Sequence, residues 1–184
     1  MARTPSRMVA LDTKAPAFTL PDPVSGKDLS LENIKGKRAT MIMFICNHCP
    51  FVKHVNAELV RLANDYKNKG IGFVAINSND VINHPDDAPG LMTQVAKQFK
   101  YPFPYLYDES QETAKAYDAA CTPDFFIYDK DLHLVYRGQL DDSRPGNEIP
   151  VTGKDIRQAL DSLISNEPVP QEQRPSIGCN IKWK

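Results

Sequence analysis

Short apolar runs alternate along this chain with segments in which apolar residues recur every three or four positions. This pattern predicts alternating strands and helices. Residues 38–45 are dominated by Met, Ile and Phe, as expected for a buried strand. In residues 50–69, apolar side chains recur at intervals of three and four residues and so line one face of a helix. Residues 71–76 form a second apolar run. A strand, a helix and a strand in this order predict parallel pairing with a right-handed crossover.

The rest of the pattern predicts an α/β fold. Short strands at residues 18–20 and 28–31 flank a turn with Pro and Gly, which predicts an N-terminal β-hairpin. The other predicted elements are a helix at 90–100, a strand at 104–107, a short helix at 111–118, strands at 124–128 and 132–138, and a helix at 154–165. We therefore expect a central mixed β-sheet flanked by helices, with a hairpin extension before it.

Two cysteines, Cys46 and Cys49, stand where the first buried strand ends and its helix begins. The first N–H groups of a helix lack internal partners and carry the positive end of its dipole, which favours a thiolate. His48 lies between the cysteines and can stabilise a thiolate as a cation or as a hydrogen-bond donor. The motif therefore predicts a redox-active dithiol, and a fairly ready oxidant, because stabilising the reduced form raises the reduction potential.

Two other interpretations of this cysteine pair remain open. A C-x-x-C pair can be half of a zinc site, but such sites usually include a second C-x-x-C or an H-x-x-x-H, which the sequence lacks. The two cysteines can also be packing residues at the end of an apolar strand. The spacing rules favour the dithiol, which needs no cofactor and no metal.

Composition narrows the class of protein. With 184 residues the chain can form one domain with a full hydrophobic core. The formal net charge of -1 and the lack of a Lys/Arg cluster argue against nucleic acid or an anionic membrane as partner. The sequence shows neither a transmembrane apolar run nor an apolar export-signal core. We expect a cytoplasmic protein, in which four cysteines are better explained by chemistry than by a disulfide scaffold.

Two distant segments are predicted to meet the dithiol. The loop of residues 77–89 follows the second strand, and parallel strands end at the same edge of a sheet. We expect this loop beside Cys46, either bordering the substrate or simply solvated. If residues 124–128 run antiparallel to the first strand, their start lies at the same edge. Thr122 and Pro123 then face Cys46.

These motifs together resemble the thioredoxin-like superfamily, and in particular its peroxiredoxin-like (AhpC/TSA, redoxin) branch. The matching segments are Ala15-Pro16-Ala17-Phe18-Thr19-Leu20, Cys46-Asn47-His48-Cys49-Pro50, and Thr122-Pro123-Asp124-Phe125-Phe126-Ile127-Tyr128-Asp129. The resemblance implies a thioredoxin-like redox domain over residues 15–166. Residues 1–14 are then an N-terminal arm, and residues 167–184 are an extended C-terminal tail docked on the domain.

The resemblance also implies roles for single residues. Cys46 matches the exposed nucleophile that attacks a substrate disulfide, and Cys49 matches the buried cysteine that resolves the mixed disulfide. Pro123 is expected in the cis form, and the backbone of Thr122 is expected to hold a substrate strand by β-pairing. His48 is expected to tune the redox properties of the pair.

The implied function is that of a thiol-disulfide oxidoreductase, with antioxidant activity in cell redox homeostasis. Its partners are then a protein or small-molecule disulfide or thiol, with a reductant of the thioredoxin or glutathione type. The sequence departs from peroxiredoxins, which place their peroxidatic cysteine where Cys49 aligns and a Thr or Ser where this chain has Cys46. A weak thiol peroxidase is therefore an alternative function. Thr40 replaces the buried acid of thioredoxin, which leaves Asp124 as a candidate acceptor for the Cys49 proton.

The C-terminal tail carries a further cysteine, Cys179. Three prolines prevent the last helix from continuing, and the two Ile and the only Trp that follow are rare in a disordered tail. Cys179 either exchanges disulfides with Cys46 or Cys121 or is a packing residue, and packing is the simpler explanation for Cys121. A protein that binds metal through the thiolates of Cys46, Cys49, Cys121 and Cys179 is the remaining alternative.

Overall fold

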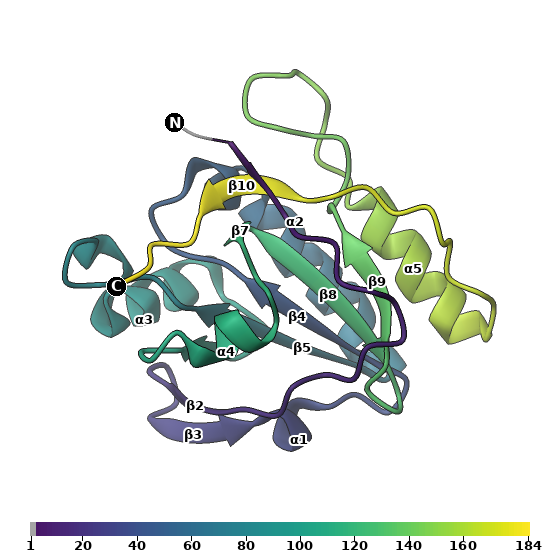
Figure 1. Cartoon of the computed structure of the whole chain (residues 1–184), viewed down its shortest axis with the longest axis horizontal. Helices are drawn as coiled ribbons and strands as arrows, with labels where there is room; N and C mark the ends of the chain where they lie inside the picture. The colour runs from purple at the N-terminus through teal and green to yellow at the C-terminus, as the bar shows by residue number, and fades with distance from the viewer. Residues whose placement is uncertain (1–2) are drawn as a thin grey trace.

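The computed structural model describes residues 3–184 and confirms the predicted thioredoxin-like α/β fold (Figure 1). The first two residues of the predicted N-terminal arm lie outside the described residues. The central sheet has the strand order β6 (Tyr105–Tyr107), β5 (Ile71–Asn77), β4 (Ala39–Phe44), β8 (Asp124–Asp129) and β9 (Leu134–Gly138). β4 pairs in parallel with β5 and antiparallel with β8, so the sheet is mixed as predicted.

Different elements bury the two faces of this sheet. One face packs against α2 (Pro50–Tyr66), α3 (Pro89–Phe99) and α5 (Lys154–Ser165). The other face packs against α1 (Leu31–Ile34), α4 (Glu112–Ala116) and the hairpin of β2 (Thr19–Asp22) and β3 (Lys27–Ser30). Neighbouring side chains of a strand point to opposite faces, and both faces of β4 are buried. Its sequence is therefore apolar throughout except for Thr40.

The local signals at the ends of α2 explain where this helix lies. Cys49 is its N-cap, and Pro50 occupies the first helical position, where its missing N–H costs no hydrogen bond. The helix passes into a single 3-10 turn, η1 (Lys67–Lys69), and Gly70 with φ 86° ends it. A second 3-10 turn, η2 (Pro85–Asp87), lies in the loop between β5 and α3. The dithiol therefore lies between a central strand and the first turn of a long helix.

The C-terminal tail lies across one end of the fold. Its strand β10 (Ile177–Asn180) pairs antiparallel with β1 (Thr4–Pro5) on one side and with β7 (Cys121–Thr122) on the other. In Figure 1 this yellow strand runs beside the start of the chain. Ile181 is buried and anchors the tail, whereas Trp183, expected to dock with it, is 43% exposed.

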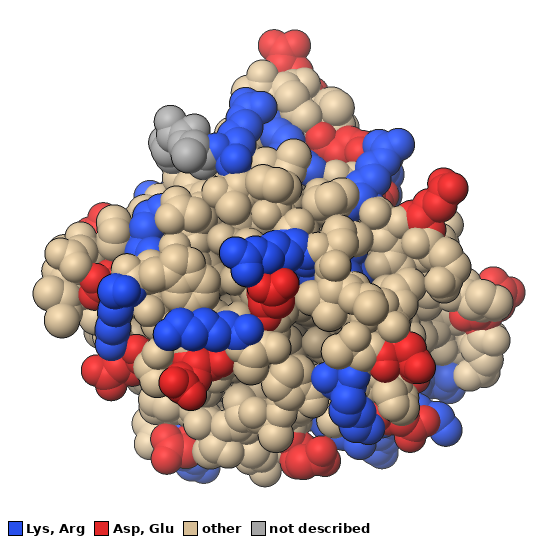
Figure 2. Space-filling view, viewed as in Figure 1, with Lys and Arg blue, Asp and Glu red and all other residues tan. Residues whose placement is uncertain are grey.

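The surface carries charges of both signs. On the face shown in Figure 2, Lys and Arg side chains lie among Asp and Glu side chains. Throughout residues 3–184, each helix is too short or too polar to cross a lipid bilayer.

Candidate active site

The dithiol occupies the junction between β4 and α2. Cys46 is 2% exposed and Cys49 is fully buried, and neither forms a disulfide in this structure. The Cys46 thiol donates a hydrogen bond to the Cys49 sulfur. The exposed position that the resemblance implied for Cys46 is therefore wrong, because the loop after β5 and the segment before β8 pack around it.

Cys49 is the acidic member of the pair. The hydrogen bond from Cys46 lowers the pKa of Cys49 to about 4 against the opposing effect of burial, with further help from Cys179 and the backbone N–H of Val52. Val52 lies in the first turn of α2, so the helix terminus acts on the N-cap sulfur. The pKa of Cys46 is raised because its proton is held by Cys49, because it is buried and because the Asp87 charge opposes a thiolate there.

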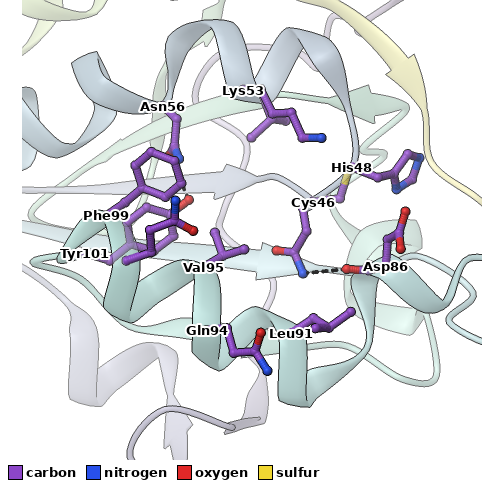
Figure 3. Close-up of a pocket in the computed structure, with 13 residues that line it drawn as sticks. Cys46, His48, Lys53, Asn56, Asp86, Leu91, Gln94, Val95, Phe99 and Tyr101 are labelled. Carbon is purple, nitrogen blue, oxygen red and sulfur yellow. Dashed lines mark hydrogen bonds between the residues drawn. The ribbon is translucent and has the colours of Figure 1, made fainter.

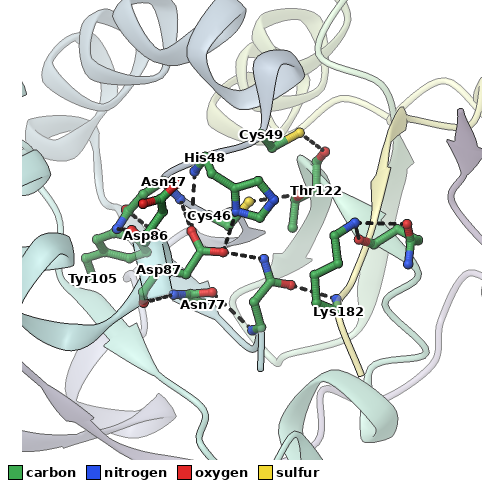
Figure 4. Close-up of polar contacts among 12 residues, drawn as sticks. Cys46, Asn47, His48, Cys49, Asn77, Asp86, Asp87, Tyr105, Thr122 and Lys182 are labelled. Carbon is green, nitrogen blue, oxygen red and sulfur yellow. Dashed lines mark hydrogen bonds and ion pairs between the residues drawn. The ribbon is translucent and has the colours of Figure 1, made fainter. Parts of the chain in front are cut away.

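Asp87 is a fully buried carboxylate that holds the turn between the two cysteines (Figure 4). Its Oδ1 accepts hydrogen bonds from the backbone N–H groups of Asn47 at 2.7 Å and His48 at 3.3 Å. Its Oδ2 lies 2.6 Å from His48 Nδ1 and accepts a bond from Asn79 Nδ2 at 2.8 Å. The sequence analysis placed this loop beside Cys46 but missed Asp87, because nothing local distinguishes it from its exposed neighbour Asp86.

Three side chains of this site could hold a metal ion. Ligand atoms of Cys46, His48 and Asp87 lie within 4.8 Å of one another. Thiolate, imidazole and carboxylate are ligands that zinc accepts. The four-cysteine metal site considered from the sequence is not formed, because within residues 3–184 the four sulfurs do not gather in a group of this size.

Thr122 faces the dithiol, as the antiparallel pairing of β8 with β4 predicted, and Pro123 follows it directly. The peptide bond between them is cis. Thr122 Oγ1 lies 3.3 Å from Cys46 Sγ, and the Thr122 carbonyl oxygen lies 3.2 Å from Cys49 Sγ and accepts its proton when Cys49 is a thiol. Thr122 therefore contacts both sulfurs.

The backbone edge of Thr122 is already occupied by the tail. In the antiparallel register of β7 and β10, Cys179 stands opposite Thr122. The Cys179 thiol and backbone N–H both bond to the Cys49 sulfur. A substrate strand was expected to pair with Thr122. In the structure, β10 of the same chain pairs there instead, with Cys179 opposite Thr122.

The two other accessory candidates lie deeper in the fold. Cys121 is fully buried, and burial raises the pKa of its thiol. Asp124 forms a buried bidentate ion pair with Arg137, with 2.9 Å between Nη2 and Oδ2, and also accepts a bond from the Ala120 N–H. Burial raises the pKa of Asp124, and Arg137 opposes this. None of the hydrogen bonds in the described part of the chain links Asp124 to Cys49.

A pocket of about 570 Å³ opens beside Cys46, between α2 and α3 (Figure 3). Val52 and Lys53 line it from α2, and Val95 and Phe99 line it from α3. The sequence analysis did not find this pocket, because its two walls are helices that meet only in the folded chain.

Comparison with known proteins places this fold and site in a family. Residues 10–156 match the family model described as Redoxin. The chain belongs to the Redoxin family. This redoxin is similar over 100% of its length to an uncharacterized conserved protein from Geobacillus kaustophilus, with 63% identity, TM-score 0.99 and 97% of that chain covered. No curated protein matches the sequence.

Two further solved structures extend the comparison. A hypothetical protein from Sinorhizobium meliloti 1021 is 47% identical to this redoxin, with TM-score 0.96 and 98% of each chain covered. A thiol-disulfide oxidoreductase from Bacteroides fragilis is 25% identical, with TM-score 0.57, over 68% of this redoxin and 89% of that chain. The fold of this redoxin is therefore thioredoxin-like, as the sequence motifs indicated.

Proposed function

We propose that this redoxin is a thiol-disulfide oxidoreductase that cycles Cys46 and Cys49 between dithiol and disulfide. The observation that carries the proposal is the placement of both sulfurs against Thr122, with Cys46 Sγ 3.3 Å from its hydroxyl oxygen and Cys49 Sγ 3.2 Å from its carbonyl oxygen. In this arrangement the side chain of Cys46 lowers the pKa of Cys49 to about 4. Only a thiolate attacks a disulfide, and the lowered pKa of Cys49 favours a thiolate in this pair. The Redoxin match and the similarity to a thiol-disulfide oxidoreductase support the same activity.

Cys46 is the proposed nucleophile because it lines the pocket, whereas Cys49 is fully buried. Cys49 accepts the Cys46 proton through their hydrogen bond as the Cys46 sulfur attacks the substrate disulfide. One substrate sulfur becomes bonded to Cys46, and the other leaves as a thiolate.

Cys49 is the proposed resolving residue. The departing thiolate takes the proton from Cys49, which then attacks the Cys46 sulfur and displaces the second substrate sulfur as a thiolate. The protein loses two electrons and gains the Cys46–Cys49 disulfide, and the substrate becomes one thiol and one thiolate, which takes up a proton from water. The same steps in reverse oxidise a dithiol partner. In the forward direction, a reductant of the thioredoxin or glutathione type reduces the Cys46–Cys49 disulfide and completes the cycle.

Thr122, His48 and Asp87 support these steps in the proposal. The Thr122 hydroxyl lowers the pKa of Cys46 and is placed to donate to the sulfur when the anion moves there. Asp87 orients the His48 ring, and its charge keeps the resting anion on Cys49 until a disulfide arrives. The role in substrate binding that the resemblance implied for Pro123 stays a prediction.

Cys179 is proposed as a third redox-active thiol. Its sulfur already contacts Cys49. Attack of the Cys179 thiolate on Cys49 would break the Cys46–Cys49 bond, form a Cys49–Cys179 bond and release Cys46 as a thiolate, so no external oxidant is needed. Burial raises the pKa of both Cys179 and Cys121, but Cys121 makes no hydrogen bond to either sulfur of the dithiol among the described residues, which favours a packing role for it. A peroxidase activity and a cytoplasmic location stay predictions.

Differential alkylation with peptide mass spectrometry across a glutathione redox titration tests the proposal. We expect one reversible disulfide between Cys46 and Cys49, and the same result in a Cys121→Ser control. Sulfurs that never pair at any potential would refute the proposed function. Sulfurs that become reactive only after a chelator is added would favour a metal site at Cys46, His48 and Asp87 instead.

A further inference from the structure

The tail closes one of the two routes by which a substrate can reach Cys46. An extended peptide binds a sheet by pairing with an open backbone edge. The edge at Thr122 is paired with Cys179 of β10. Beyond β10 the Lys182 N–H donates to Asn79 Oδ1 at 2.8 Å, and the Lys184 N–H donates to Gln111 Oε1 at 2.9 Å. The tail is therefore held along its length, and a protein segment finds no free edge there.

The pocket between α2 and α3 is the second route, and its dimensions suit a small molecule. Its volume of about 570 Å³ lies within the range of roughly 300–1,000 Å³ typical of small-molecule sites. Leu91, Val95 and Phe99 of α3 give it an apolar wall, and Figure 3 shows Cys46 on the opposite side. A ligand packed on that wall can present a sulfur to Cys46.

Polar groups around the pocket indicate the chemistry of the ligand. Lys53 and Asp86 line the pocket with one positive and one negative charge. Gln94 adds a carboxamide group, which can both donate to and accept from an amide. The Asn56 oxygen already accepts from the Tyr101 hydroxyl at 2.7 Å, so Asn56 offers the ligand its amide N–H groups. A ligand with a carboxylate, an ammonium group and an amide satisfies all four side chains.

We propose that this pocket binds a zwitterionic, cysteine-containing small disulfide or the corresponding thiol, and that such molecules rather than protein segments are the substrates of Cys46. The inference rests on the proposed function, because the ligand reacts with the same dithiol. The small disulfide accepts two electrons from Cys46 and Cys49 and leaves as one thiol and one thiolate, which takes up a proton from water. Its carboxylate pairs with Lys53, and its ammonium group pairs with Asp86.

Three probe disulfides and two pocket variants test this inference. The rate of Cys46–Cys49 disulfide formation is followed by quenched alkylation with oxidised glutathione, with uncharged bis(2-hydroxyethyl) disulfide and with insulin. We expect a saturable reaction with oxidised glutathione and a far slower one with insulin. Lys53→Gln should lower the rate with oxidised glutathione about tenfold, because a charge-assisted bond is lost, and leave the uncharged probe within about twofold. Val95→Trp should slow both small probes by filling the pocket.

The controls separate this inference from the proposed function. Lys97→Gln removes the same charge from α3 outside the pocket and should change neither rate. Lys53 is exposed, so Lys53→Gln keeps the test decisive even if Val95→Trp fails to fold. Equal rates with insulin and oxidised glutathione would overturn the pocket assignment, and so would an unchanged rate with oxidised glutathione in Lys53→Gln. Neither result would contradict the dithiol function. Failure of all three probes to form the Cys46–Cys49 disulfide overturns the function itself.

Discussion

The position of Cys49 at the start of α2 lowers the pKa of this sulfur relative to that of Cys46. Cys49 is the N-cap of α2, where the backbone N–H of Val52 helps to lower the pKa of its sulfur, whereas Cys46 precedes the helix and faces the Asp87 carboxylate. One sulfur is therefore stabilised as an anion and its partner as a thiol. In the proposed mechanism, the proton that they share moves to Cys49 when Cys46 attacks a substrate disulfide.

The titration of Cys49 is a direct prediction. Thiolate absorbance at 240 nm of the reduced protein should fall as the pH drops through about 4, far below the ordinary cysteine pKa of 9.0. Because folding lowers this pKa, the thiolate stabilises the reduced protein fully above pH 9.0, and this contribution is lost progressively as the pH falls to about 4. Cys49→Ser should abolish the acidic transition, and Cys121→Ser should retain it. An acidic transition that survives in Cys49→Ser would contradict this assignment.

At the level of elements, the contact between β10 and β7 depends on a glycine. A Cβ atom added to Gly178 would lie 2.0 Å from the Thr122 carbonyl oxygen, which is backbone and cannot rotate away. The close approach is what brings Cys179 into register with Thr122 and its sulfur to Cys49. The tail can therefore occupy the Thr122 edge only with glycine at this position.

Gly178→Ala should separate β10 from β7. We expect it to lower the free energy of unfolding by about 3 kcal/mol, the upper part of the range for overpacked sites, and to speed hydrogen exchange at Cys121 and Thr122. Gly90→Ala is the control, because a Cβ there meets nothing within 4 Å. Urea unfolding and hydrogen exchange measure both effects. Equal stability of the two variants would show that the strands do not need this contact.

At the scale of the whole molecule, the end of the chain is linked to the dithiol by hydrogen bonds. Asn79 accepts from the Lys182 N–H and donates to Asp87, and Asp87 holds His48 (Figure 4). Asp80 N–H donates to the Lys182 carbonyl oxygen at 2.8 Å and fixes the same contact. Tail, loop and dithiol turn thus form one connected network.

The position of the tail predicts a specific cross-link. In a Cys46→Ser variant equilibrated with oxidised glutathione, Cys49 should form a disulfide with Cys179, because these sulfurs are already in contact. Peptide mass spectrometry should find this bond and leave Cys121 reduced. Cys46→Ser combined with Cys179→Ser is the control and should yield only glutathione adducts. Adducts without a Cys49–Cys179 bond in the single variant would restrict Cys179 to packing.

Much of the fold and part of the site could be predicted from local patterns. The helix at 154–165 and the turn from strand to helix at Cys46 were predicted because periodicity and the proline at the helix start are local properties. Asp87 and the pocket were not, because both depend on how the loop after β5 and α3 pack against α2. The exposure of Cys46 was wrong for the same reason.

The sequence by itself determined the order of strands and helices, the junction that carries the dithiol and the resemblance to redoxins, since these follow from spacing along the chain. The tertiary structure alone decided that the pKa of Cys49 is lowered while that of Cys46 is raised, that Cys179 pairs with the Thr122 edge and that a pocket opens beside Cys46. The physical reason is that hydrogen bonding, burial and charge at a sulfur depend on neighbours brought together from distant parts of the chain. The periodicity of the sequence reports local structure and does not contain those distances.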